Sequence, residues 1–213
     1  MRLVLFSGGV DSTTALFWSK KECATHALIF KYPSLHNKRE IDAAVRICKN
    51  ENISYTLLDM SSVFVGFKSA LLQNSSESIP QDSYNLESMA KLVVPFRNGI
   101  FLSVAAGLAE SLGYKEIVLA NHAGDHPLYP DCTKAFIDSM NESIMQGSGG
   151  AVKLCSPFCN WDKKEIVKLG LSLGVDYTKT YSCYGGGEKH CNTCPTCIES
   201  NESFLANGIV MER

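Results

Sequence analysis

Six residues near the start of the chain have the types and spacing of a phosphate-binding loop. Residues 7–12 read Ser-Gly-Gly-Val-Asp-Ser, follow the apolar run of residues 3–6 and lead into the first turns of a predicted helix. Backbone N–H groups converge at a helix N-terminus, where the helix dipole adds about half a positive charge. Gly8 and Gly9 let the backbone turn sharply and approach a ligand closely. The segment therefore predicts an anion site.

The side chains of this loop add to that prediction. Hydroxyl groups of Ser7, Ser12 and Thr13 can donate to phosphate oxygens, and Asp11 can hold a magnesium ion. No Gly-Lys-Ser/Thr follows at the spacing of a Walker loop. An ordinary glycine turn is the alternative, but the position directly after the first strand favours a nucleotide site. The residues predicted to bind the nucleotide are Phe6, Ser7, Gly8, Gly9, Val10, Asp11, Ser12, Thr13, Thr14, Ala15 and Leu16.

A second group of residues has metal-ligand spacing. Four of the nine cysteines, Cys183, Cys191, Cys194 and Cys197, fall within fifteen residues. Four thiolates make the closed tetrahedral shell that zinc takes in structural sites. An iron–sulfur cluster, unrelated free thiols and a nucleic-acid-binding zinc knuckle are the alternatives, and the knuckle lacks a basic patch. His190 is more simply a bystander than a ligand.

A third group, residues 121–132, lies at the carboxyl end of a predicted strand. It holds two histidines, two carboxylates, a tyrosine and a thiol, which could bind a planar heterocycle or transfer protons. Within it, Asp125, His126, Tyr129 and Asp131 are the candidate site residues. Asp131 could instead cap the following helix. Cys132 could be a nucleophile, although a buried small side chain is the simpler interpretation.

Alternating strands and helices must position these three groups. Apolar runs and helical spacing predict strands at residues 3–6, 24–31, 53–58, 116–120 and 152–156, and helices at residues 37–50, 99–112, 131–145 and from 161 onward. Asn37 is a plausible cap, Gly113 a helix stop, and Gly170 or Gly174 the end of the last of these helices. This alternation predicts a parallel, doubly wound α/β sheet with ligands beyond the carboxyl ends of its strands.

Composition narrows the class of protein. The 213 residues are 45% hydrophobic with a net charge of −2, which predicts one globular domain over residues 1–213 with a zinc-binding segment at 183–197. Neither a nucleic-acid partner nor a membrane partner is expected, because there is no basic surface, long apolar run or signal peptide. We therefore expect a cytoplasmic protein. Residues 73–86 form a polar excursion that is either a lid or an ordinary loop.

Together these motifs carry a family resemblance. They are the phosphate loop, Val94 to Asn98 with Phe101 to Ser103, Asp125 to Cys132 with Phe136 and Ile137, Lys163 to Gly170, and Thr180 to Tyr184 followed by the cysteines. In this order they resemble the 7-cyano-7-deazaguanine synthases of queuosine precursor biosynthesis. These belong to the ATP pyrophosphatases, whose fold is adenine nucleotide alpha hydrolase-like. The sequence departs from the family pattern at Thr133 to Ala135, at Tyr181 and at Tyr32 to His36.

The resemblance implies a ligase chemistry. ATP with magnesium would adenylate the carboxylate of 7-carboxy-7-deazaguanine, ammonia would displace AMP to give an amide, and a second ATP would convert the amide to the nitrile. The implied zinc is structural, and the implied assembly is a homodimer. Asp11, Arg97, Lys163 and Asp125 are the candidate catalytic residues, and Arg97, His126, Tyr129 and Asp131 the candidate substrate-binding residues. A surface ion pair is the alternative for Arg97 and Lys163.

Three other functions stay open at this point. A related adenylating ligase could stop at the amide or attach the deazaguanine to another acceptor. An RNA-modifying thiolase or lysidine-type enzyme could share the loop, although the charge balance offers no RNA-binding surface. A nucleotide sensor without turnover is the third.

Overall fold

A computed structural model describes residues 1–76, 78–79, 90–125 and 129–211. Its centre is a five-stranded sheet in the order β3-β2-β1-β4-β5, with every neighbouring pair parallel. The strands are β1 (Arg2–Leu5), β2 (Thr25–Lys31), β3 (Ser54–Asp59), β4 (Glu116–Val118) and β5 (Lys153–Cys155). The predicted parallel, doubly wound sheet is confirmed.

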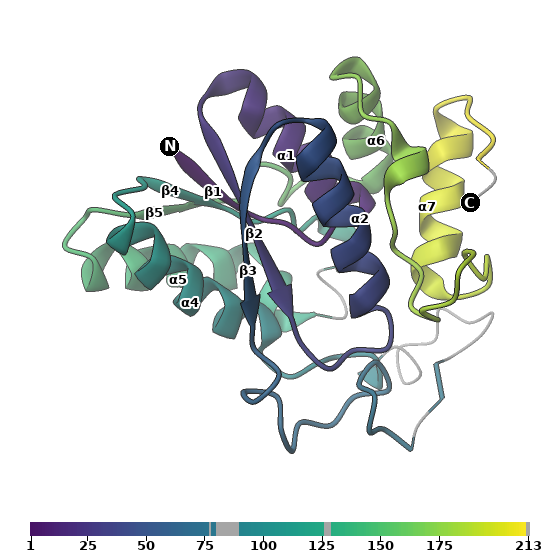
Figure 1. The fold of residues 1–213 in the computed structure, drawn as a ribbon, viewed down its shortest axis with the longest axis horizontal. Coiled ribbons are helices and arrows are strands. Elements are labelled where there is room, and N and C mark those ends of the chain that lie inside the picture. The colour runs from purple at the N-terminus through teal and green to yellow at the C-terminus, as the bar shows by residue number, and fades with distance from the viewer. Residues whose placement is uncertain (77, 80–89, 126–128, 212–213) are drawn as a thin grey trace.

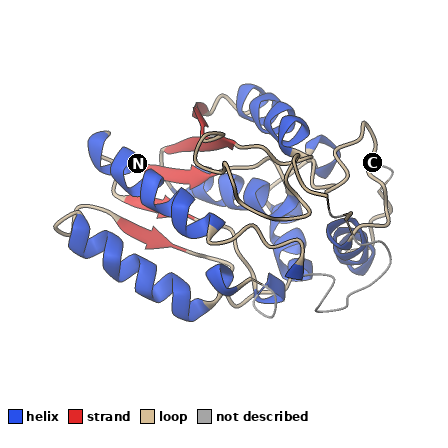
Figure 2. Cartoon of the chain, turned by 90° about the horizontal axis from the view of Figure 1, so that it is seen from below, coloured by secondary structure: helices blue, strands red, loops and turns tan. Residues whose placement is uncertain are grey.

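Helices cover both faces of this sheet (Figures 1 and 2). They are α1 (Val10–Glu22), α2 (Asn37–Asn50), α4 (Arg97–Ser111), α5 (Lys134–Gly147), α6 (Lys163–Ser172) and α7 (Pro195–Ala206). Successive residues of a strand point to opposite faces, so Leu3 and Leu5 enter the core under α4 and α5, whereas Val4 enters the core under α1, α2 and α6. The C-terminal helix α7 packs outside α6, where Phe204 meets Val167.

Local signals set most element boundaries. Helix α4 ends before Gly113, whose φ of 69° is the left-handed conformation expected of a glycine stop. Helix α6 begins with a capping box in which Asp162 accepts from the Glu165 N–H and Glu165 accepts from the Asp162 N–H. It ends at Ser172, before Gly174 with φ 79°.

Two predicted helix caps are wrong. Asn37 does not cap α2, because its side chain accepts from the Tyr32 N–H at 2.9 Å and donates to the Phe30 carbonyl at 3.0 Å. The helix predicted from residue 131 is α5, which begins at Lys134 with Thr133 as its cap. The Asp131 carboxylate instead accepts from the Asn98 N–H at 2.8 Å in the first turn of α4. It thus ties α4 to the loop before α5.

Two further predictions concern a lid over the site and contact with a membrane. The proposed lid at residues 73–86 lies largely outside the described residues. Among the helices that are described, none has the length and apolar character needed to cross a membrane.

Candidate functional site

A cavity among the described residues lies where the strand order reverses. The chain runs outward from β1 to β3 and then returns to place β4 on the other side of β1, so the loops after β1 and β4 diverge there. Such a switch point is the usual ligand crevice of a doubly wound sheet. A cavity of about 270 Å³ opens at this place. Both loops line it, together with the starts of α1, α2, α4, α6 and α7.

The phosphate loop forms one end of this cavity. Ser7 Oγ accepts from the Gly9 N–H at 3.2 Å and lies 3.1 Å from Ser12 Oγ. Gly9 is the residue before α1 and no side chain caps it, so the N–H groups of the first turn have no acceptor within their own helix. An anion is the complementary ligand for such an end.

Only some of the eleven residues predicted to bind the nucleotide line the cavity. Those that do are Phe6, Ser7, Gly9, Val10, Asp11 and Ser12. The remaining five, Gly8, Thr13, Thr14, Ala15 and Leu16, are buried behind it. Thr13 donates to the Gly9 carbonyl at 2.7 Å, and Thr14 shares a hydrogen bond of 2.7 Å with the Tyr177 hydroxyl. These two hydroxyls therefore support the loop from behind, because α1 turns them away from the cavity.

We expect Gly8→Ala to destabilise the chain by about 2 kcal/mol or more. Gly8 has φ 85°, and a Cβ atom there would lie 2.7 Å from the Ala44 nitrogen and 2.8 Å from the Glu40 carbonyl oxygen. Both contacts are backbone atoms of α2, which cannot rotate away. Denaturant unfolding measures the loss. Gly107→Ala is the control, since nothing lies within 4 Å of its added Cβ; an equal loss in both variants would contradict the prediction.

Beside the loop lies a cluster of charged groups centred on Lys163. Its side chain is 6% exposed, and Nζ lies 2.6 Å from Glu199 Oε2 and 3.3 Å from Asp11 Oδ2. Burial alone would lower the pKa of the Lys163 ammonium, but the carboxylates of Asp11, Glu199 and Asp125 outweigh it and raise the pKa. The ammonium is therefore permanently charged at the edge of the phosphate loop. Burial raises the pKa of Asp125, which lines the same space.

The Nε2 atom of His122 faces the same carboxylates. Its Nδ1 accepts from the Gly124 N–H at 3.1 Å, so the proton of a neutral ring sits on Nε2. Nε2 lies 3.7 Å from Asp125, 3.8 Å from Glu199 and 4.0 Å from Asp11. Three carboxylates thus lie around the Nε2 atom of the buried ring, each beyond hydrogen-bond distance.

The other end of the cavity is built around Arg97. This guanidinium lies 3.4 Å from the Tyr32 hydroxyl, and in the described part of the chain it forms no ion pair. Burial alone would lower its pKa, but Tyr32, Cys132 and Tyr184 outweigh that effect and raise it. Burial and the Arg97 charge lower the pKa of His36 to about 4, so that ring is neutral. A fixed cation in an aromatic surrounding suits an anionic, planar ligand.

Glu40 also lines this end, and we expect it to make stability depend on pH. Burial raises its pKa from 4.5 to about 8, against the opposing charge of Arg97. The protonated carboxyl favours the folded state, an effect that is complete below about pH 4.5 and lost as pH rises through about 8. From about pH 6 to 9, the free energy of unfolding should fall by about 2–3 kcal/mol more in the natural chain than in Glu40→Gln.

Chemical denaturation at the two pH values, with both proteins loaded with the same metal, measures that difference. Glu51→Gln is the matched control, because Glu51 pairs with Lys20 on the surface. Parallel pH curves for the natural chain and Glu40→Gln would contradict the prediction.

The predicted substrate-binding residues are only partly brought together. Arg97, Tyr129 and Asp131 line the cavity, whereas His126 lies outside the described residues. The Asp131 carboxylate is already bound to the Asn98 N–H. Cys132 also lines the cavity, but burial raises the pKa of its thiol, so it is not an activated nucleophile.

The four candidate metal ligands come together at the start of α7. The sulfur atoms of Cys183, Cys191, Cys194 and Cys197 all lie within 4.8 Å of one another. Sulfurs about 2.3 Å from one zinc ion stand about 3.8 Å apart in a tetrahedron, so this donor set fits a single ion. The N–H groups of Cys191 and Cys194 donate to the sulfurs of Cys183 and Cys191 at 3.3 Å, which favours thiolates.

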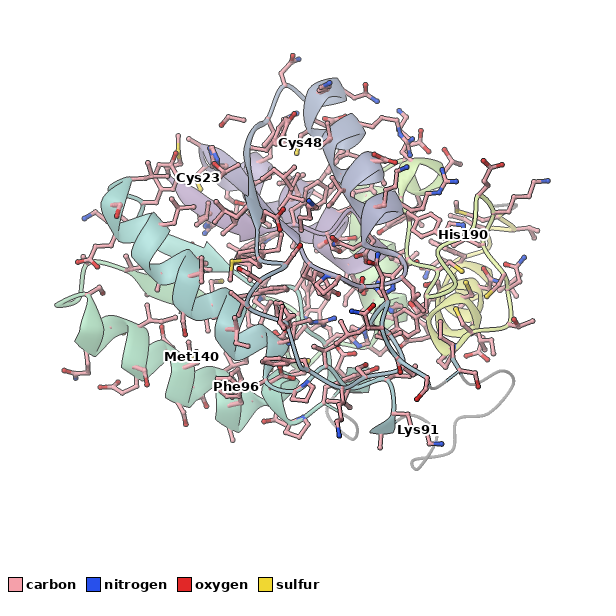
Figure 3. All side chains as sticks on the ribbon, turned by 60° about the horizontal axis from the view of Figure 1, so that its bottom comes forward. Cys23, Cys48, Lys91, Phe96, Met140 and His190 are labelled. Atoms are coloured by element: carbon pink, nitrogen blue, oxygen red, sulfur yellow. The ribbon has the colours of Figure 1, made fainter. Side chains whose placement is uncertain are left out.

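The neighbouring His190 and two other cysteines lie outside the four-sulfur cluster. His190 accepts from the Ser182 N–H at 3.3 Å, and its ring lies tilted against that of Tyr181 with the centroids 4.8 Å apart, as expected of a residue beside the site. Figure 3 labels His190 in this segment and shows Cys23 and Cys48 well away from it. Those two thiols are therefore not part of the site.

Several site residues escaped prediction from the sequence. They are Tyr32, His36, Glu40, His122, Tyr184 and Glu199, all lining the cavity. His122 belongs to the polar group at residues 121–132 that was predicted to bind a ligand, but it was not itself a candidate. Glu199 lies two residues after the last cysteine. The spacing of His36 and Glu40 on a helix start was a weak signal for a shared face. Nothing in the local sequence signalled that Glu199 pairs with Lys163.

Comparison with known proteins supplies the family. The chain matches the family described as queuosine biosynthesis protein QueC over residues 1–208. A 7-cyano-7-deazaguanine synthase from Porphyromonas gingivalis is 42% identical over 207 residues, covering 97% of this chain and 93% of that protein. One from Archaeoglobus fulgidus is 38% identical over 209 residues, covering 97% and 87%. These matches confirm the resemblance that the motifs predicted.

Solved structures agree on the fold. An NMN synthetase from Francisella tularensis superposes with a TM-score of 0.56 at 15% identity, covering 99% of this chain and 78% of that one. An NH3-dependent NAD synthetase from Campylobacter jejuni gives 0.50 at 16% identity, covering 98% and 78%. The fold is adenine nucleotide alpha hydrolase-like, as predicted.

Proposed function

The chain is an enzyme of the queuosine biosynthesis family QueC, and we propose that it converts 7-carboxy-7-deazaguanine, ammonia and ATP to 7-cyano-7-deazaguanine. One observation carries the proposal beyond the family match. A single cavity joins a phosphate-binding loop with Lys163 at one end to Arg97 at the other, a half-buried cation that forms no ion pair among the described residues. Such a cavity can hold a nucleotide and an anionic heterocycle with their reacting groups together.

The nucleotide end performs the activation. The carboxylate oxygen of the substrate attacks the α-phosphorus of ATP, and pyrophosphate leaves. The first-turn N–H groups of α1 and the Lys163 ammonium stabilise the charge that develops on the leaving pyrophosphate. Magnesium, held by Asp11, supplies further charge neutralisation when bound. Arg97 binds the carboxylate of the deazaguanine and orients its oxygen, because a guanidinium can hold a carboxylate through two hydrogen bonds.

The remaining steps reuse the same site. Ammonia attacks the acyl carbon, AMP leaves with the former carboxylate oxygen, and the amide results. A second ATP then takes the amide oxygen, and loss of a second AMP with the amide protons leaves the nitrile. We assign to Asp125 the role of accepting a proton from the attacking nitrogen, because it lines the cavity and burial raises its pKa. Tyr129 is assigned to the heterocycle, and so are His126 and Asp131 from the sequence.

Zinc is the ion proposed for the four cysteines. Four thiolates leave no open position for a catalytic water, so its role is structural. The compact sulfur arrangement supports one ion over a multi-iron cluster, whose ligands must stand farther apart. Metal analysis of protein purified without added metal tests the assignment.

A labelled assay tests the reaction. Purified protein receives 7-carboxy-7-deazaguanine with 18O in its carboxylate, ATP, magnesium and 15N-ammonium, and products are resolved by mass. We expect a nitrile one mass unit heavier than the unlabelled one, with 18O in both AMP molecules. The amide supplied in place of the carboxylate should give the nitrile without ammonium. A 15N-amide as the end product favours the ligase that stops there, and no AMP formation contradicts the proposal.

Assembly and location complete the proposal. A homodimer in the cytoplasm is the arrangement expected from the family resemblance, and both stay predictions. Light scattering of the purified chain tests the first, and a fluorescent fusion in cells tests the second.

A further inference from the structure

The cysteine segment forms one wall of the cavity. Cys183 is flanked by Ser182 and Tyr184, and both line the cavity. Cys194 and Cys197 enclose Pro195 and Thr196, which also line it. Each of these four residues is thus next to a candidate metal ligand in the sequence, so a metal bound by the cysteines would determine where this part of the wall lies.

The same segment touches the phosphate loop directly. The Tyr181 N–H, two residues before Cys183, donates to the Gly8 carbonyl at 3.0 Å. A Cβ at Gly9 would lie 3.6 Å from the Tyr181 carbonyl oxygen and 3.9 Å from Ser182 Cβ. The residues before Cys183 therefore lie directly beside the loop, close enough to contact a side chain introduced at Gly9.

Glu199 connects this wall to the charged cluster. It lies in α7 two residues after Cys197, with Oε2 2.6 Å from Lys163 Nζ and Oε1 3.8 Å from His122 Nε2. Lys163 in turn lies 3.3 Å from Asp11 at the phosphate loop. One carboxylate thus spans two side chains from α6 and from the loop after β4. The start of α7, the helix that carries Glu199, holds two of the four candidate metal ligands, Cys194 and Cys197.

We propose that Glu199 is a positioning residue through which the metal-bound cysteines hold Lys163 and His122 in place beside the phosphate loop. The inference rests on the proposed function for the identity of the nucleotide and of the metal. Because coupling between two binding sites is reciprocal, nucleotide binding and metal retention should strengthen each other.

The first test needs no nucleotide. Zinc-loaded protein is mixed with a chromogenic chelator, and zinc transfer is followed over time. We expect Glu199→Gln to release zinc at least about fivefold faster, since an amide holds the ammonium more weakly than a carboxylate does. Glu202→Gln, an exposed position on the same helix, is the control and should match the natural chain. Equal release from Glu199→Gln and the natural chain overturns the proposal.

The second test adds magnesium and ATP. We expect ATP to slow zinc release in the natural chain and in Glu202→Gln, and to have little effect in Glu199→Gln. In turnover, Glu199→Gln should lower kcat more than it raises KM for ATP, because a misplaced ammonium acts on the leaving pyrophosphate. Undiminished protection by ATP in Glu199→Gln, with unchanged kcat, overturns the proposal.

The outcomes separate the two proposals. A natural chain that makes no AMP, while Glu199→Gln still loosens zinc, contradicts the proposed function and supports the positioning role. A natural chain that makes the nitrile, while zinc release is the same in all variants, contradicts the positioning role alone.

Discussion

Lys163→Met is expected to lower AMP formation by about 10²- to 10³-fold, the effect of losing one group that stabilises transition-state charge. The ammonium lies 3.3 Å from Asp11 at the edge of the phosphate loop, and its side chain is buried. A methionine fills similar volume and carries no charge, so the loop keeps its shape and loses its cation. Chromatographic measurement of AMP and pyrophosphate under saturating ATP gives the change.

The same substitution should also lower the free energy of unfolding by about 3–5 kcal/mol. It leaves the carboxylates of Asp11, Asp125 and Glu199 facing one another without a fixed cation. Lys164→Met is the matched control, because the neighbouring lysine is exposed. Adding Glu199→Gln to Lys163→Met removes one of the unpaired charges and should recover part of the stability without recovering activity. Recovery of both would show that Lys163 acts only through folding.

The sequence predicted the scaffold well because its signals are local. Residues 37–50 were predicted as a helix, and α2 has those bounds. Gly113 stops α4 through its own backbone conformation, which depends on no distant contact. The two wrong caps, Asn37 and Asp131, fail for one reason. Each side chain has a hydrogen-bond partner in another segment, and that partner outcompetes the N–H groups of its own helix.

The site was less predictable because it depends on contacts between elements. Glu199 and Lys163 lie 36 residues apart, on two helices whose relative placement no local pattern encodes. The tautomer of His122 is set by the Gly124 N–H. This is a backbone group, which nearly every residue type carries, so the sequence gives no sign of the contact. Motifs therefore identified the loop, Lys163 and the cysteines, whereas the groups that orient them required the fold.

These orienting groups connect the cysteine segment to the phosphate loop and to Lys163. The Tyr181 N–H donates to the Gly8 carbonyl of the phosphate loop, and Glu199 binds Lys163, the proposed catalytic lysine. A segment that only sealed the surface would need neither contact. The four cysteines, the start of α7 and the phosphate loop therefore form one continuous wall, and we expect the loss of one cysteine to affect the phosphate loop as well as the proposed metal site.

Cys194→Ser should abolish stoichiometric zinc binding and lower the free energy of unfolding by about 4 kcal/mol, the stabilisation expected when free metal exceeds its Kd about 1,000-fold. Cys194 is fully buried and immediately precedes α7, so its loss removes a ligand and frees the helix start. Metal analysis and denaturant unfolding measure the two effects. Cys23→Ser, a half-buried thiol outside the cluster, is the control.

A chelator separates metal loss from packing loss in this experiment. After chelation, the natural chain and Cys194→Ser should unfold at nearly the same denaturant concentration, because the substitution itself changes little volume. Cys23→Ser should lose as much stability on chelation as the natural chain does. A Cys194→Ser protein that keeps one zinc and full stability would contradict the four-cysteine site. In that case the wall beside the phosphate loop would have to be held by its hydrogen bonds alone.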